Sequence, residues 1–206
     1  MLPMSSSCQH IVHLFQGGGA SWSAVRVLAG GVEGPSTGDG HLARPYGLRF
    51  SRDGVHLAVA DRHNGRVSLF RTCDGAFQRH VVTGIETPYD VEECEGGWLV
   101  ACGHSLHMVT FVSGHAVGEG ARFRPEGRSA LGRRGAGAPH MFQWPSGLAL
   151  VPGLGLFVRE DADQGRVRCF ATPDAVAMAS MSRHRVAWMG CGVRGILQRR
   201  CVPSQR

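Results

Sequence analysis

Apolar residues in this chain fall into many short runs, and few stretches show a long helical stripe. Runs such as HLAVA (56–60), WLVA (98–101) and LFV (156–158) are separated by Gly, Pro, Asp and Asn. Short apolar runs bounded by turn residues are typical of β-strands, whereas an amphipathic helix repeats its apolar positions with a longer period. The pattern therefore predicts an all-β protein.

One order of elements recurs three times along the chain. Each copy has an apolar run, a Gly-containing turn, a second apolar run, a polar turn and a third run. The copies begin at a proline and close on a phenylalanine that follows it by 25, 23 and 25 positions, as Pro45–Phe70, Pro88–Phe111 and Pro145–Phe170. IVHLF at 11–15 matches RVSLF at 66–70 and adds a partial fourth copy. Such a series predicts consecutive antiparallel meanders.

These patterns divide the chain into three predicted parts. Residues 1–10 are expected to be a disordered arm, 11–171 the repeat region, and 172–206 a short helix with a basic tail. Thr172 followed by proline is a favourable helix start, although RVAWMG at 185–190 could instead be an outer strand. The four units lie near 11–30, 45–84, 88–138 and 145–171, with a Gly/Arg-rich insertion lacking a strand at 113–140.

The first full copy resembles a known repeat. Its residues 45–70 contain Pro-x-Gly-Leu, Asp-Gly, Val-Ala-Asp and Asn-Gly-Arg-Val-x-x-Phe. This pattern resembles the NHL repeat, the four-stranded blade of a class of β-propellers. The copy at 145–170 matches well, but the second copy departs from the pattern because Asp90 replaces glycine and Gly103 replaces the acid.

The resemblance covers about residues 11–171 and implies a fold. It implies an NHL-like β-propeller, or an open propeller segment, of about three to four antiparallel blades. Propellers usually close with about four to eight blades, so the ring would be incomplete. An incomplete ring exposes apolar edges, which makes self-association to complete the ring a possible partner mode.

The polar turn before each third strand is expected to be architectural. Asp61 and Arg66 flank a tight turn and could pair across it, and Asn64-Gly65 fits a type I′ turn. Val67 and Phe70 are expected to bury against neighbouring blades. The residues given this structural role are Asp61, Asn64, Gly65, Arg66, Gly165 and Arg166.

Charge is distributed unevenly along the chain. All 22 basic residues are arginine; residues 1–120 hold 8 of them against 11 acids, a net charge of −3, and residues 121–206 hold 14 against 5, a net charge of +9. A Gly/Arg-rich segment can hold single-stranded nucleic acid, but it can equally be a solvated surface. RNA binding is therefore the alternative function, through Arg122, Arg124, Arg128, Arg133 and Arg134.

Cysteine usage and the start of the chain bear on location. The seven cysteines are odd in number and form no C-x-x-C, which favours free thiols in a reducing compartment. The first residues lack the basic region and length of a signal peptide, and no apolar run is long enough to cross a membrane. A cytoplasmic protein without membrane contact is expected.

No sequence pattern here supplies a complete catalytic site. Phosphate loops, G-x-S-x-G and H-E-x-x-H are missing from the sequence, so no catalytic residue, cofactor or metal is assigned. Some NHL-like propellers are metal-dependent lyases, and a lyase or lactonase type is the second alternative. Nothing in this sequence matches the metal site of those lyases residue by residue. Separate weak candidates are a zinc set of Cys94, Cys102, His104 and His107, and a calcium set of Glu160, Asp161 and Asp163, which are expected to fill the turn that matches 62–64.

Repeats without a catalytic constellation favour a non-enzymatic scaffold for protein–protein interaction. Blade loops at one face would supply the contact surface. The candidate binding residues are Arg44, Tyr46, Arg62, His63, His104 and Trp144.

Overall fold

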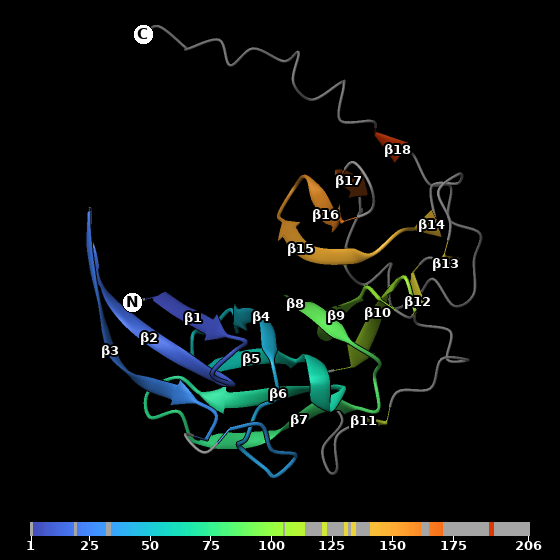
Figure 1. The fold of residues 1–206 in the computed structure, drawn as a ribbon. Coiled ribbons are helices and arrows are strands. Elements are labelled where there is room, and N and C mark those ends of the chain that lie inside the picture. Colours follow the sequence, from blue (N-terminus) through green and yellow to red (C-terminus); the bar gives the residue numbers. More distant parts are fainter. Residues whose placement is uncertain are drawn as a thin grey trace, which may run out of the picture.

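The computed structural model describes residues 2–18, 20–31, 34–104, 106–113, 121–122, 130–131, 133–134, 141–161, 165–170 and 190–191. Their strands form small antiparallel sheets that follow one another along an open arc (Figure 1). The predicted fold class is confirmed: the protein is all-β, with successive blades compatible with an open propeller-like segment. Within the described residues no helix has the length and apolar character that a membrane crossing requires.

Four blades account for most of the strands. Blade 1 contains β1 (Leu2–Ser6), β2 (Ile11–Gly18) and β3 (Ser21–Ala29). Blade 2 contains β4 (Pro45–Phe50), β5 (His56–Asp61), β6 (Arg66–Arg71) and β7 (Phe77–Thr83). Blade 3 contains β8 (Pro88–Cys94), β9 (Gly97–Cys102), β10 (Met108–Ser113) and β12 (Ala130–Leu131). Blade 4 contains β15 (Pro145–Val151), β16 (Gly155–Glu160), β17 (Arg166–Phe170) and β18 (Gly190–Cys191).

The proline-headed strands β4, β8 and β15 lie on the inside of the arc and contact one another in that order (Figure 1). Proline suits this place because the first residue of a strand can lack an N–H donor. In each blade the proline pairs with the last residue of the second strand: Asp61, Cys102 or Glu160. The start of the inner strand and the end of the second strand therefore lie at the same end of the blade.

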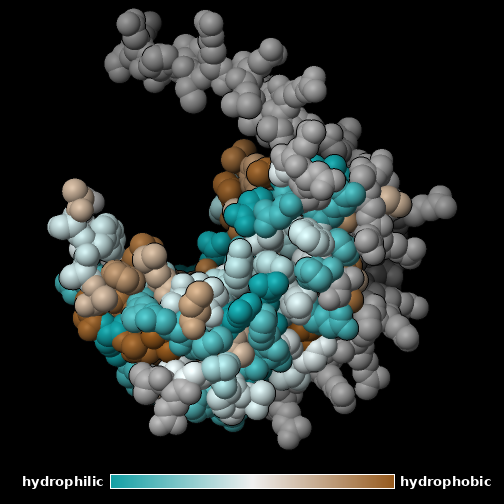
Figure 2. Space-filling view, viewed as in Figure 1, coloured by the Kyte–Doolittle hydropathy of each residue, from teal (hydrophilic) through white to brown (hydrophobic). Residues whose placement is uncertain are grey.

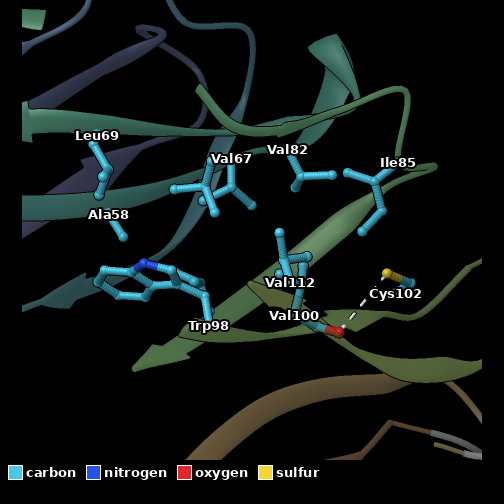
Figure 3. Packing of buried hydrophobic residues seen from close by; sticks show 11 residues of the cluster. Ala58, Val67, Leu69, Val82, Ile85, Trp98, Val100, Cys102 and Val112 are labelled. Carbon is cyan, nitrogen blue, oxygen red and sulfur yellow. Dashed lines mark hydrogen bonds between the residues drawn. The ribbon is translucent and has the colours of Figure 1, made fainter. Parts of the chain in front are cut away.

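Apolar side chains fill the space between consecutive blades. Figure 3 shows Ala58, Val67 and Leu69 of blade 2 facing Trp98 and Val100 of blade 3. The same sheet buries its other side against blade 1. This two-sided burial explains why the second and third strands read as continuous apolar runs, because both of their faces leave water. Each fully buried aliphatic side chain contributes about 1.5–3 kcal/mol.

The predicted burial of Val67 and Phe70 is confirmed. Val67 is fully buried and packs toward Val91 and Val100 of blade 3. Phe70, on the opposite face of the same strand, packs toward blade 1, where Val12 lies.

The expectation of a disordered arm at 1–10 is wrong. Leu2–Ser6 forms β1, which pairs antiparallel with β2. β2 contains the IVHLF segment, which matches the third strand of the other blades. β1 pairs with it and therefore occupies the second-strand position. The described residues of blade 1 contain no strand at the innermost position. A five-residue strand with two serines lacks the apolar alternation that would reveal it, and pairing with β2 supplies the missing stabilisation.

The expectation that 113–140 contains no strand is also wrong. β12 is the fourth strand of blade 3, and β11 (Ala121–Arg122) adds to blade 2 beside β7. β13 (Arg133–Arg134) and β14 (Met141–Phe142) form a separate parallel pair. Two-residue strands are too short for an alternating pattern, so only long-range pairing defines them.

The helix predicted from Thr172 lies outside the described residues. β18 begins at Gly190, the last residue of the 185–190 segment, and pairs with β17 as an outer strand does.

The turn at 61–66 differs from the predicted type I′ hairpin. Arg62–Asn64 forms the 3₁₀ turn η1, and Gly65 follows it in the left-handed conformation at φ 61° and ψ 43°. Asn64 is held by hydrogen bonds from its side-chain amide to Asp61 and to the Ser36 carbonyl. These contacts favour the longer turn. A Cβ at Gly65 would lie 2.9 Å from the Ile85 carbonyl oxygen.

Candidate partner-binding surface

The chain makes a sharp turn before each proline-headed strand. Arg44, Thr87 and Trp144 precede the prolines and have φ values of 48°, 44° and 52°. Left-handed non-glycine residues are uncommon, so three at equivalent places mark a shared constraint. The turns lie at the end of the blades where the second strand finishes, and the side chains of Arg44 and Trp144 are exposed there.

The structure brings the six predicted binding residues to this end. Together with one tyrosine that the sequence did not single out, five of them form what we call the aromatic–arginine surface: Arg44, Tyr46, Arg62, Tyr89, His104 and Trp144. His63 lies beside it in η1 and is exposed.

Arg62 and two tyrosines form the centre of this surface. The Arg62 guanidinium carbon lies 4.5 Å from the Tyr89 ring centroid and 5.9 Å from that of Tyr46. The tyrosine rings meet edge to face with centroids 5.1 Å apart. Cation–π contacts of this kind orient a guanidinium without neutralising it.

A second aromatic pair continues the surface over blades 3 and 4. The His104 ring stacks on Trp144 with centroids 5.3 Å apart. Gly103 lies close to two neighbouring blade segments, since a Cβ there would lie 3.0 Å from the Tyr89 ring and 3.0 Å from the Pro145 carbonyl oxygen.

The alignment of Gly103 with Asp61 is wrong, because Pro88 pairs with Cys102 as Pro45 pairs with Asp61. Cys102 therefore takes the place of the acid, and Gly103 follows it in a position where packing leaves no room for a side chain.

The two arginines at the η1 end of blade 2, Arg44 and Arg62, place positive charge beside His63. Partial desolvation, and then the charges of Arg44 and Arg62, lower the pKa of His63. Among the described residues neither Arg44 nor Arg62 forms an ion pair with a carboxylate. The Nε of Arg62 is buried and has no hydrogen-bond partner there.

A buried ion pair supports the blade 2 part of the surface. Arg66 donates from Nε to Asp61 at 2.8 Å, as the sequence suggests, and Asp61 also accepts the Ala43 N–H at 2.6 Å. Arg66 further donates to the carbonyls of the connecting segment at Thr37, Gly38 and His41. The pair thus fixes the backbone that precedes Arg44.

Glu160 and Arg166 repeat this arrangement in blade 4. Glu160 accepts the Gln143 N–H at 3.0 Å and pairs with Arg166. Glu160 therefore corresponds to Asp61. The interpretation of it as one of three acids in a turn is wrong; Asp161 pairs with Arg159 instead, and Asp163 lies outside the described residues.

Two histidines hold the surface in the other blades: His10, which the sequence analysis did not single out, and His107, which it considered only as a metal ligand. His10 Nδ1 accepts the Arg44 N–H at 2.9 Å, and His107 Nδ1 accepts the Trp144 N–H at 3.1 Å. Both have positive φ, at 60° and 49°, and both directly precede a third strand. Aligning them with Gly65 and Gly165 would have identified their position, though not their hydrogen bonds.

Tyr89 and Asp90 were also missed as contributors. Tyr89 has a visible indication, because Pro-Tyr occurs at both 45–46 and 88–89. Asp90, noted only as a departure from the repeat, accepts the Leu148 N–H at 2.8 Å and so links blades 3 and 4. Burial raises the pKa of Asp90.

The alternative nucleic-acid residues are only partly described. Arg122 lies in β11, and Arg133 and Arg134 lie in β13. Arg124 and Arg128 lie outside the described residues. The register pairs Arg122 with Thr83 of β7, and Arg134 with Phe142 of β14, two residues before Trp144.

The weak metal-ligand set does not converge. Cys94 and Cys102 lie at opposite ends of the β8–β9 hairpin, because Cys94 pairs with Gly97 and Cys102 with Pro88. Burial raises the pKa of Cys94 to about 12 and raises that of Cys102 further. His104 and His107 are engaged with Trp144. No group of three or more ligating side chains occurs in the part of the chain that the structure describes.

One polar network has the composition of a catalytic triad. Ser68 Oγ lies 3.1 Å from His80 Nδ1, and His80 Nε2 lies 3.1 Å from Asp39 Oδ1. Ser68 is 1% exposed, so a substrate carbonyl has no approach to its hydroxyl. Burial and the nearby Arg66 lower the pKa of His80. The network ties the segment before β4 to blade 2.

A comparison with known protein families finds no family model that matches the chain. Its NHL resemblance stays a prediction from the repeated residues.

Proposed function

We propose that this chain is a non-enzymatic, NHL-like scaffold that binds a protein partner through the aromatic–arginine surface. The observation that carries the proposal is the convergence of exposed aromatic and arginine side chains from three blades at one end. Tyr46 is 41% exposed and Trp144 is 44% exposed, although Tyr46 is held in β4 and Trp144 in the positive-φ turn before β15.

This composition suits protein recognition. Tyrosine, tryptophan and arginine are enriched at the energetic centres of protein interfaces, because they combine large apolar area with a polar end. Their rigid placement also lowers the conformational entropy lost on binding. Loops on a rigid scaffold are the usual location of such sites.

The test compares partner capture by three forms of the full chain. Wild-type protein and Val55→Ala, an exposed residue at the opposite end of blade 2, are expected to retain the same partner from an extract. The double variant Tyr46→Ala, Trp144→Ala is expected to lose it. Equal capture by all three forms would exclude this surface, and capture abolished by ribonuclease would favour the RNA alternative.

Self-association is a second candidate supported by a separate observation. Figure 2 shows apolar side chains over blade 1 and blade 4, on both sides of the opening of the arc. Met4 in blade 1 and Val167 in blade 4 are 50% and 44% exposed. Light scattering of the purified chain tests this proposal, since a concentration-independent monomer mass would contradict it.

A further inference from the structure

We infer that the partner of the aromatic–arginine surface presents an acidic, extended peptide segment whose carboxylate binds Arg62. This inference rests on the proposed function and names the chemistry of its partner. It is carried by the contrast between Arg62 and the other arginines of blades 2 and 4 that lie near the same end.

Apart from Arg44, which precedes β4 and belongs to the surface itself, those other arginines already have carboxylate partners. Arg66 pairs with Asp61, Arg166 with Glu160 and Arg159 with Asp161. Arg49, on the inner strand, pairs with Glu92 of blade 3 at 2.9 Å. Arg62 has no such partner among the described residues. Its guanidinium rests on Tyr89, and its buried Nε has no hydrogen bond there.

A carboxylate suits this site for geometric reasons. A guanidinium presents its N–H donors as a planar fork that matches the two oxygens of a carboxylate. Tyr89 holds the fork in place before the ligand arrives, which limits the entropy lost on binding. Arg44 adds a second positive charge nearby, since both arginines lower the pKa of His63.

The aromatic geometry favours a peptide over single-stranded RNA. Binding of bases depends on open ring faces on which successive bases can stack. Here Arg62 lies over a face of Tyr89, and His104 lies over a face of Trp144. The charge around the surface is also local, because residues 1–120 have a net charge of −3. A few carboxylates match this site better than a continuous phosphate backbone does.

The test is fluorescence anisotropy with a labelled peptide of alternating Glu and Pro, and a matched peptide with Gln in place of each Glu. Proline keeps both probes extended. The acidic peptide is expected to bind the wild-type chain, and the neutral one to bind at least about 10-fold more weakly, because the charge-assisted hydrogen bonds are lost. Raising salt from about 50 to about 200 mM is expected to weaken the acidic complex.

Variants of the full chain complete the test. Arg62→Gln is expected to weaken binding of the acidic peptide about 10-fold, and Arg62→Lys, which keeps the charge but loses the fork, by less. Arg71→Gln is the control, because Arg71 is exposed at the other end of blade 2 and pairs with Asp74. Thermal midpoints of the variants check that the fold is retained.

Three results would overturn the inference. They are equal binding of both peptides, unchanged binding by Arg62→Gln, and tighter Arg62-dependent binding of an RNA oligonucleotide. If peptide binding fails while the Tyr46 and Trp144 substitutions still abolish partner capture, the partner is not acidic and the scaffold function stands. If both assays fail, the proposed function fails as well.

Discussion

Blades 2 and 4 carry the most similar sequences in this protein but lie in different surroundings. Blade 2 packs between blades 1 and 3, whereas blade 4 has blade 3 as its single neighbouring blade among the described residues. Equivalent residues therefore differ in exposure: the Arg66 side chain is 8% exposed and that of Arg166 39%. The repeat thus defines the ion pair within each blade. The neighbouring blades determine how deeply that pair is buried, and so how much it stabilises the fold.

The largest expected effect is loss of the buried acid. Asp61→Ala leaves Arg66 buried without its counter-charge, and we expect a loss of about 3–5 kcal/mol in the free energy of unfolding. Glu160→Ala removes the matching acid of blade 4, but water can reach Arg166, so the expected loss is about 1–3 kcal/mol. Chemical denaturation measures both. Equal losses would show that the neighbouring blades do not matter at this position.

The equivalent inner-strand glycines, Gly47 in blade 2 and Gly147 in blade 4, differ in the space available for a side chain. A Cβ at Gly47 would lie 2.6 Å from the Tyr89 carbonyl oxygen and 2.6 Å from the Asp90 Cα. These are backbone atoms that cannot rotate away, so Gly47→Ala is expected to cost about 3 kcal/mol.

At Gly147 the nearest atom to a Cβ is Arg159 Cβ, at 3.2 Å. Gly147→Ala is expected to change stability by about 0.5 kcal/mol or less. Thermal unfolding of the two variants decides the point. A Gly147 loss as large as that at Gly47 would contradict the packing difference.

Equivalent valines in the third strands of blades 2 and 4 also differ in burial, and the expected effect on stability is smaller. Val67 is fully buried and Val167 is 44% exposed. Val67→Ala is expected to lower the free energy of unfolding by about 2 kcal/mol, and Val167→Ala by about 0.5 kcal/mol. Urea denaturation of the two single variants measures the difference. A Val167 effect matching that of Val67 would indicate that another surface covers blade 4 in solution.

The smallest expected effect concerns Asp90. In blade 3 it occupies the position that Gly47 has in blade 2 and Gly147 has in blade 4. Burial raises the pKa of Asp90 above its ordinary value of 3.8. At pH values between 3.8 and the raised pKa, Asp90 retains its proton in the folded chain but has released it in the unfolded chain. The contribution of Asp90 to stability therefore falls as pH rises through this range.

Asp90→Asn removes this titration. The stability of the wild type relative to Asp90→Asn is therefore expected to decrease as pH rises from 3.8 through the folded pKa. Denaturation of both proteins over a pH series checks the direction. A difference that stays constant or grows with pH would contradict it.

Much of the fold could be predicted from the sequence because it depends on neighbouring residues. Proline starts the inner strands, short apolar runs form the buried second and third strands, and the Asp61–Arg66 ion pair lies within a few residues. The resemblance of the copies in order and spacing was enough to predict successive blades. The binding residues could be placed in turns at one end, since equivalent positions of a repeat lie at equivalent places.

Only the tertiary structure decided what those residues contact. β1 is stabilised by β2, His10 and His107 accept N–H groups from the following blade, and Arg62 lies on a tyrosine of the next blade. These partners are separated in sequence by up to 37 residues in the case of His107 and Trp144. Local propensity carries no information about such pairs, because their energies arise only after the blades have packed together.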